Sequence, residues 1–256
     1  MRCAILICAA IIMCAFSSAW SAGVEMAVGF GRQSIGGTLS YSETNIADVI
    51  DLDNDLHFDE ESKVMGRLKI DVPMFFPNIY LVAAPMEFEG NGSKSGTLNF
   101  GDTTFDFSVG LNTKLSLNQY DVGLYYGLPF VKTATLGKLN LDLGLNVRIV
   151  DFEAEVTGVS GGVTVTERHD LALPIPMLYA GIQFMPVKAL AFEVEGRGIA
   201  VGDNKLVSLL GRVRFRFAGP VFIAGGYRYD KLEIDEEDVI ADIEFQGPFV
   251  EMGLKF

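Results

Sequence analysis

The chain has 256 residues, a formal net charge of −13 and 49% hydrophobic residues. This acidic balance argues against nucleic-acid binding, which needs a basic surface to meet the phosphates. Beyond residue 22 there is no run of about 18 apolar residues, so the predicted fold contains no transmembrane helix. A chain that is both acidic and this hydrophobic without such a helix is typical of alternating strands with one lipid-facing side.

The first 22 residues have the features of a secretory signal peptide. Arg2 is followed by an apolar run too short to span a bilayer, and residues 17–22 offer small side chains for cleavage. We expect cleavage after Ser21, with the neighbouring alanines as alternatives. Lipidation at Cys14 fits less well, because the large Met13 precedes it.

The mature chain, residues 23–256, is predicted to be a single domain. The three cysteines all lie before it, so we expect no disulfide, no cysteine-bound metal and no cofactor. Alternating polar and apolar residues predict strands along its whole length. In chain order these are 24–42, 62–72, 79–90, 113–127, 138–157, 163–184, 189–202, 205–217, 221–230 and 239–256.

These segments predict an all-β fold, a closed antiparallel up-and-down transmembrane barrel of about ten strands. Eight strands remain an alternative if 91–112 and its flanks pair differently. Short connections with Pro or aromatic residues alternate with mostly longer polar ones. That is the pattern of outer-membrane barrels, and an even strand count then puts both termini in the periplasm.

Alternation is clearest at 138–149, where six apolar side chains share one face and polar residues including Arg148 share the other. The run exceeds the about 9–11 residues that one oblique membrane crossing needs. Aromatic residues near the strand ends predict two interfacial girdles. One would include Tyr80 and Phe184, and the other Phe88, Phe152 and Phe245, among others.

The last strand ends at Phe256. The apolar residues of its final part, which share one face, are Val250, Met252, Leu254 and Phe256. This ending resembles the β-signal read by the outer-membrane assembly machinery. Farther upstream the apolar residues occupy odd positions instead, so the sequence predicts a bulge or bend at Gly247-Pro248.

The mature chain is similar to small bacterial outer-membrane β-barrel proteins and to an uncharacterised family of them marked by a Gly-Gly element. The matching stretches are 47–52, 77–81, 225–229 and the C-terminal strand. The resemblance implies an outer-membrane location and a barrel fold. It implies no activity, because members of that family carry no established reaction and fold alone does not give function.

The hairpin at 189–217 suggests what fills the barrel. A two-residue turn at Asp203-Asn204 would place Glu195 opposite Arg212 and Glu193 opposite Arg214, all on one face. The predicted inward charge network is Glu193, Glu195, Arg197, Arg212, Arg214, Arg216 and Arg228. Because barrels of about eight strands are just filled by side chains, such a network would occlude a ten-stranded lumen or leave a narrow gated path. The alternative is a satisfied polar interior without a transport role.

The acidic segment 43–61 contains Asp51-Leu52-Asp53-Asn54-Asp55, which is similar to the start of a calcium loop. Leu56 and Ser62 stand where that loop requires Gly and Glu, so we expect no dedicated site. Solvated loops that bridge loosely to lipopolysaccharide phosphates through divalent ions are the preferred interpretation. Because the segment also carries several aliphatic residues, either outward folding or insertion as a plug remains open.

Enzymatic activity is not expected. The candidate bases are His57, in the acidic segment, and His169. Asp170 cannot readily orient His169, because adjacent strand residues point to opposite faces. We find neither the His-x-Ser-Asn element of barrel lipid hydrolases nor the paired acidic sites of barrel proteases.

The sequence therefore predicts a monomeric outer-membrane barrel, structural or forming a narrow porin-like channel for small molecules. Its expected partners are outer-membrane lipids, lipopolysaccharide and the assembly machinery. A lipid-modifying enzyme and a loop-mediated adhesin are the alternatives.

Overall fold

The computed structural model describes residues 23–41, 49–58, 61–73, 75–92, 97–100, 103–106, 110–236 and 239–256. Nearly all of them lie in strands, as the alternating sequence predicts. The strands are β1 Gly23–Tyr41, β2 Ile50–Asp51, β3 Glu61–Asp71, β4 Asn78–Ala84, β5 Glu87–Gly92, β6 Thr97–Phe100, β7 Thr103–Asp106, β8 Leu111–Gly127, β9 Leu139–Ser160, β10 Val163–Val187, β11 Leu190–Val201, β12 Asn204–Ala218, β13 Val221–Glu236 and β14 Val239–Lys255.

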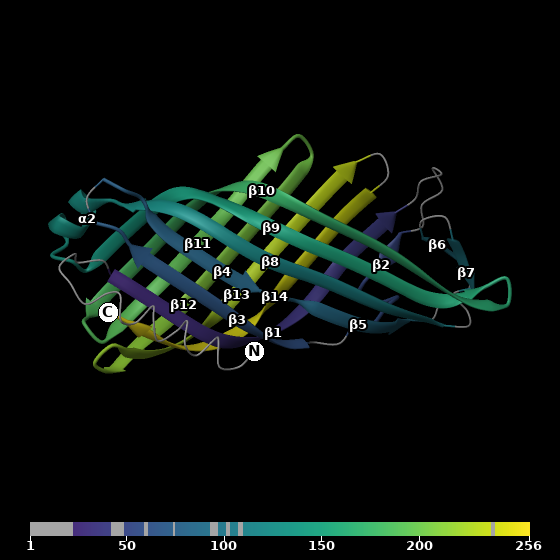
Figure 1. Ribbon diagram of the computed structural model, residues 1–256, viewed down its shortest axis with the longest axis horizontal. Coiled ribbons are helices and arrows are strands. Elements are labelled where there is room, and N and C mark those ends of the chain that lie inside the picture. Colours follow the sequence, from purple (N-terminus) through teal and green to yellow (C-terminus); the bar gives the residue numbers. More distant parts are fainter. Residues whose placement is uncertain are drawn as a thin grey trace, which may run out of the picture.

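These strands close into an antiparallel barrel (Figure 1). From β8 to β14 each strand pairs with the next in sequence, β8 also pairs with β4, β4 with β3 and β3 with β1, and β14 pairs back onto β1. Since β4 and β5 pair with the same strand, β8, they occupy one strand position in the barrel wall. We call each strand position of the wall a stave, and the barrel has ten staves. The extra strands are β2 and the β6–β7 hairpin. The predicted ten-stranded closed barrel is therefore confirmed. Among the described helices, none is long and apolar enough to cross a membrane.

The barrel has two different ends. At the turn end lie Gly23, Phe256, the short helix α2 (Pro129–Ala134) and the tight connections of the strands (Figure 1). At the loop end lie segment 49–58, the β6–β7 hairpin and the projecting β9–β10 hairpin. We use these two names below because they divide the interior into two chemically different halves.

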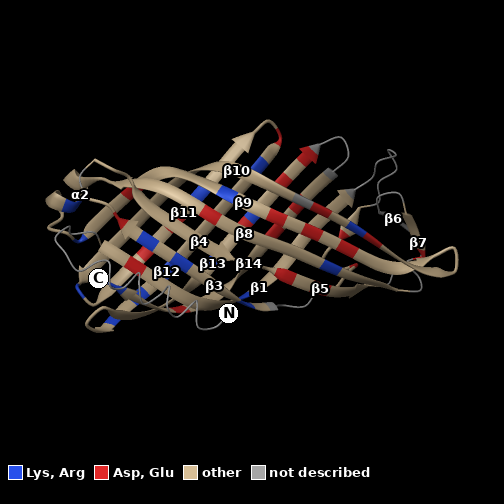
Figure 2. Ribbon diagram, viewed as in Figure 1, with Lys and Arg blue, Asp and Glu red and all other residues tan. Residues whose placement is uncertain are grey.

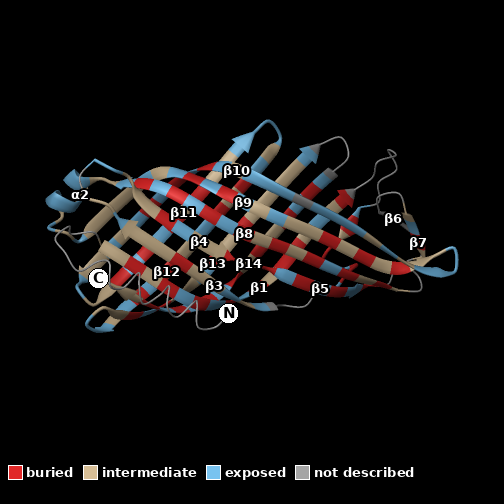
Figure 3. Ribbon diagram, in the orientation of Figure 1, coloured by how far each residue is buried: buried red, intermediate tan, exposed pale blue. Residues whose placement is uncertain are grey.

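The outer face is apolar, as a lipid-facing surface requires. On β9 the side chains of Leu143, Leu145 and Val147 are exposed, whereas Asn146 and Arg148 between and beside them are buried. Figure 3 shows this alternation of buried and exposed residues along the staves. Exposed large hydrophobic residues recur on all ten staves, and together they form a belt around the barrel.

The predicted aromatic girdles need correction. At the turn end Phe75, Phe130 and Phe184 are exposed as expected, but Tyr80 is buried and faces the lumen. At the loop end Phe88 and Phe245 are also buried inside. Each of these three residues occupies an inward position of its strand, so closeness to a strand end did not determine which face it belongs to.

The predicted register of the β11–β12 hairpin is wrong by two residues. Glu193 pairs with Arg212, and Val201 pairs with Asn204, so the two-residue turn is Gly202-Asp203. Gly202 has φ +60°, a conformation that glycine adopts readily, and this fixes the turn one residue earlier than expected. Because the strand period is two, the shift leaves every side chain on its expected face.

Of the bulge or bend predicted at Gly247-Pro248, the bulge is absent, although the β1–β14 ladder is interrupted at these two residues, between Gly31–Phe249 and Ser34–Gln246. The β13–β14 register runs without a shift from Val221–Leu254 to Glu236–Val239. Odd-numbered residues face inward throughout β14, from Ala241 to Gly253. What changes along the strand is the barrel's interior, which is apolar near Ile243 and charged near Glu251.

Candidate functional site

A layer of ionised side chains crosses the lumen on the turn-end side of its middle. We call it the charged layer. Its members are Glu25, Arg67, Lys69, Asp121, Arg148, Glu193, Glu195, Arg197, Arg212, Arg214, Arg228, Asp230 and Glu251. All are buried except Lys69, whose side chain is 15% exposed. They come from inward positions of staves around the barrel, and Figure 2 shows basic and acidic residues interleaved there.

Arg148, with no exposed surface, is the centre of one cluster in this layer. Its Nε donates to Asp121 Oδ1 at 2.8 Å and its Nη2 to Asp121 Oδ2 at 2.9 Å, which is a bidentate pair. Its Nη1 donates to Asp230 Oδ1 at 3.0 Å, and Arg228 Nε donates to the other oxygen of Asp230 at 2.6 Å. These bonds tie β8, β9 and β13 together across the lumen.

A second cluster surrounds the first and last strands. Arg67 donates from Nη1 to Glu25 at 2.6 Å and from Nη2 to Glu251 at 2.7 Å. Arg212 bonds to Glu193, and its Nη2 donates to Glu195 Oε1 at 3.2 Å. Buried ions of opposite sign satisfy one another in this way, so the layer is a filled structure with little free space.

The structure brings six of the seven predicted network residues into the charged layer: Glu193, Glu195, Arg197, Arg212, Arg214 and Arg228. Arg216 lies nearer the turn end and is only half-buried. The sequence-based network lacked its partners on distant strands, such as Arg67, Asp121 and Glu251. Their strand parity could have indicated an inward position, as it did for Arg148.

Three spaces show how the lumen is divided. Within the charged layer the free volume is about 20 Å³, beside Arg148 and Arg197. On the turn-end side a polar vestibule of about 420 Å³ is lined by Lys69, Asp142 and other polar residues. On the loop-end side lies an apolar cavity of about 130 Å³. The charged layer therefore separates a polar half of the lumen, at the turn end, from an apolar half at the loop end.

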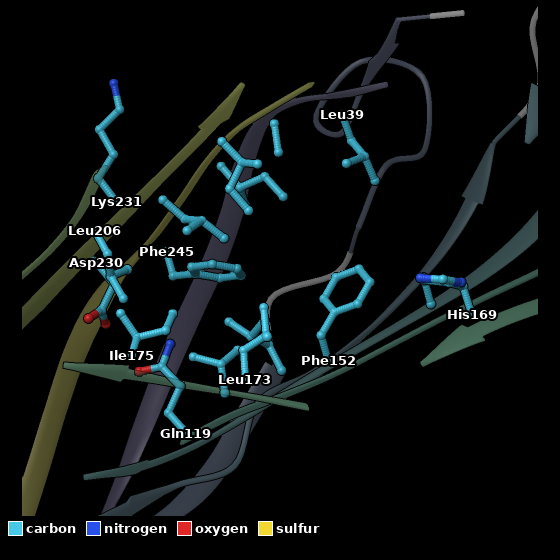
Figure 4. A pocket seen from close by; sticks show the side chains of 17 residues that line it. Leu39, Gln119, Phe152, His169, Leu173, Ile175, Leu206, Asp230, Lys231 and Phe245 are labelled. Atoms are coloured by element: carbon cyan, nitrogen blue, oxygen red, sulfur yellow. The ribbon is translucent and has the colours of Figure 1, made fainter. Parts of the chain in front are cut away.

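The apolar cavity is built from inward residues of strands far apart in sequence. Its lining is Leu39, Leu117, Gln119, Val150, Phe152, Ala154, His169, Leu173, Ile175, Leu206, Asp230, Lys231, Leu232, Ile234, Ala241, Ile243 and Phe245. Figure 4 shows Leu173, Ile175 and Phe245 around the cavity, with Gln119 and Asp230 at its margin; Asp230 belongs to the charged layer. Aliphatic and aromatic side chains predominate, so the space favours an apolar occupant over water.

Segment 49–58 covers this apolar half at the loop end, and we call it the lid. Ile50, Leu52 and Leu56 are buried in the cluster that contains Phe88 and Phe245. β2 of the lid pairs with β1, and its other end bridges to β5 between Phe58 and Gly90. Of the two open interpretations of the acidic segment, the described part therefore inserts.

The backbone of the lid packs closely against Gly90 and Gly92 of β5. A Cβ at Gly92 would lie 2.1 Å from the carbonyl oxygen of Asp55. We expect Gly92→Ala to displace the lid and to raise cleavage within 49–58 about tenfold, because local opening costs less free energy. The measurement is limited proteolysis with an enzyme specific for acidic residues. Gly211→Ala is the control, since a Cβ there meets nothing within 4 Å; equal cleavage of both variants would contradict this close packing.

Other candidate residues lie as follows. His169 is exposed at the edge of the cavity lining, and His57 is exposed in the lid. In the part of the chain that the structure describes, no group of three or more His, Cys, Asp or Glu residues could hold a metal ion. Of the C-terminal assembly residues, Val250, Met252 and Phe256 are exposed on the lipid-facing side.

The sequence matches no protein-family model and no curated protein. Among solved structures, the chain is similar to the outer membrane protease OmpT from Escherichia coli, with a TM-score of 0.54 at 10% identity over 93% of this chain and 99% of that one. It also matches the translocator domain of the autotransporter NalP from Neisseria meningitidis (TM-score 0.46, 8% identity, 97% and 93% covered). A third match is Ail of Yersinia pestis (TM-score 0.40, 9% identity, 93% and 100% covered). At these identities the likeness concerns the fold alone, which is that of an outer-membrane β-barrel.

Proposed function

We propose that this barrel binds small apolar molecules in its loop-end cavity, as a step in their passage across the outer membrane. The observation that carries the proposal is the apolar cavity of about 130 Å³, which lies between the barrel wall and the charged layer. Only Gln119, His169, Asp230 and Lys231 of its lining residues are polar or charged. An ordinary barrel interior of this kind would be polar throughout.

The size of the cavity selects the class of ligand. An apolar cavity of about 150 Å³ stays dry and accepts benzene. A space of about 130 Å³ therefore suits a molecule with a single ring or a short branched chain. Burying such a ligand yields about 25 cal/mol for each Å² of apolar surface removed from water, which supports weak, exchangeable binding.

The charged layer argues against a wide aqueous pore. The cavity found there, about 20 Å³, has room for about one water molecule, far less than a continuous aqueous path needs. The narrow path expected from the sequence would thus need side-chain movement in this layer. Binding at the loop end needs no such movement.

The remaining assignments belong to the same proposal. The turn end faces the periplasm, the exposed belt contacts outer-membrane lipid and lipopolysaccharide, and the barrel works as a non-enzymatic monomer. The assembly machinery reads Val250, Met252, Leu254 and Phe256. Membership of the family with the Gly-Gly element rests on Gly225-Gly226 and its flanks.

Filling the cavity tests the function. Ala241 is 4% exposed and lines the cavity, so Ala241→Phe would place a ring where the ligand lies. We expect this variant to bind fluorobenzene at least about tenfold more weakly than the wild type. Fluorine NMR of the purified barrel in lipid nanodiscs measures the bound fraction, because the cavity-bound and lipid-dissolved ligands give separate resonances.

The matched control is Ala180→Phe, the same change at an exposed position of β10 on the lipid-facing side. It should bind fluorobenzene as the wild type does. Undiminished binding by folded Ala241→Phe would refute the cavity as the binding site.

A further inference from the structure

The barrel wall is unpaired beside the apolar cavity. β10 pairs with β9 along its whole length, from Val163–Ser160 to Phe184–Leu139. Its pairing with β11 starts only at Leu178–Gly198 and continues toward the turn end. In that register residues 175–177 of β10 lie opposite 199–201 of β11 but form no ladder with them, and residues 163–174 of β10 extend past the end of β11. We call this opening in the wall the lateral gap.

Two prolines suit β10 to such a gap. Pro174 and Pro176 lie opposite Ile149 and Val147 within the continuous β9 ladder. Because proline has no N–H, it occurs in sheets at edges where no donor is required. An unpaired donor at membrane depth would cost several kcal/mol, and the two prolines remove that cost from the exposed edge.

The cavity reaches the lateral gap. Leu173 lines the cavity and yet is 45% exposed, so this wall residue contacts both the interior and the outside. The positions that border the gap near the turn end are apolar as well, with Leu178 70% exposed on β10 and Val201 65% exposed on β11. The charged residues of this part of β10, Glu167, Arg168 and Asp170, lie farther toward the tip of the β9–β10 hairpin.

A second break in the wall lies between β3 and β5, where pairing of the stave with β3 ends at Gly66–Ala83. Its free volume is only about 10 Å³. Lys63 Nζ crosses it to Glu87 Oε2 at 3.2 Å. This break is therefore filled and bridged, which distinguishes it from the lateral gap.

We propose that apolar ligands move between the loop-end cavity and the surrounding lipid through the lateral gap between β10 and β11. The inference rests on the proposed function and adds the route. The charged layer blocks the way along the barrel axis, so a ligand that enters the cavity leaves sideways. The partner at the gap is the bilayer itself, near the loop-end edge of the apolar belt.

A crosslink across the gap tests the route. Pro176→Cys combined with Ala200→Cys places thiols on opposite rims, both at exposed positions outside the cavity lining. The native cysteines all lie within the first 22 residues, so a chain beginning at residue 23 has no competing thiol. A short bis-maleimide then joins the rims, and the unlinked variant is the reference.

The readout is exchange of fluorobenzene between lipid and cavity in nanodiscs, followed by fluorine saturation transfer. We expect the crosslink to slow exchange at least about tenfold while the equilibrium occupancy stays unchanged. The control crosslink joins Ala180→Cys to Gly196→Cys, which are register partners in the paired part of the same β10–β11 seam. It should leave the exchange rate unaltered.

The possible failures are separable. If exchange is as fast with the 176–200 crosslink as without it, and the cavity still fills, the lateral route is wrong and the proposed binding function stands. If the unmodified protein gives no cavity-bound resonance, the binding function is wrong and the route falls with it.

Discussion

Arg148→Leu is expected to lower the free energy of unfolding by about 3–5 kcal/mol. The variant would leave Asp121 and Asp230 buried without the cation that bonds to both at 2.8 to 3.0 Å. Arg228 would still bond to Asp230, but Asp121 would keep only Asn146 and a distant Arg197, whose Nε lies 3.8 Å away. Urea titration of the barrel in lipid vesicles, followed by its heat-modifiable mobility on gels, measures the loss.

Arg168→Leu is the matched control. Arg168 bonds to Glu153 at 2.9 Å, but the two side chains are 55% and 39% exposed. Exposed ion pairs contribute about 0–1 kcal/mol, so this variant should unfold almost as the wild type does. Equal losses for the two variants would show that burial does not determine the strength of these pairs, and the interpretation of the charged layer as a rigid barrier would fail.

Leu145→Arg tests the lipid-facing belt and is expected to cost about 2–4 kcal/mol. Leu145 is 65% exposed near the middle of β9's apolar outer face, where an arginine would have to enter hydrocarbon. The same vesicle unfolding experiment measures the change. A small effect would mean that this face does not meet the membrane interior.

The control for that change is Leu136→Arg at the turn end. Leu136 is 90% exposed and lies in the connection between α2 and β9, outside the barrel wall. An arginine there reaches water, and the cost of a charge falls to about 0–1 kcal/mol near the interface. The difference between the two variants, rather than either value alone, locates the membrane.

The sequence was sufficient for the staves because alternation is a local property. Each of the ten predicted strands corresponds to a stave, including 79–90, which the structure divides at Pro85-Met86. The β11–β12 register was missed by two residues, because Gly202-Asp203 and Asp203-Asn204 are both acceptable turns. Only the actual backbone, with Gly202 at φ +60°, distinguishes them.

The apolar cavity could not be predicted in the same way. Alternation separates two faces of a strand but does not say which one is inside. Because the lumen of an ordinary barrel is polar, Phe245 was placed in an interfacial girdle and the apolar odd positions of β14 were interpreted as the sign of a bulge or bend. The ion pairs of the charged layer could not be predicted for a different reason. Arg67 and Glu251 are 184 positions apart in the sequence, and no local pattern relates them.

The seam between β1 and β14 has a consequence for how the molecule forms. It joins Glu25 to Lys255, so the barrel cannot close until β14 has reached β1. Contacts between such remote positions slow folding, because the intervening chain loses freedom before the contact can stabilise it. The bonds from Arg67 to Glu25 and Glu251 join those same two strands to β3. These ion pairs therefore form only when the sheet closes, because an incompletely closed sheet would leave both the strand edges and these ions without partners.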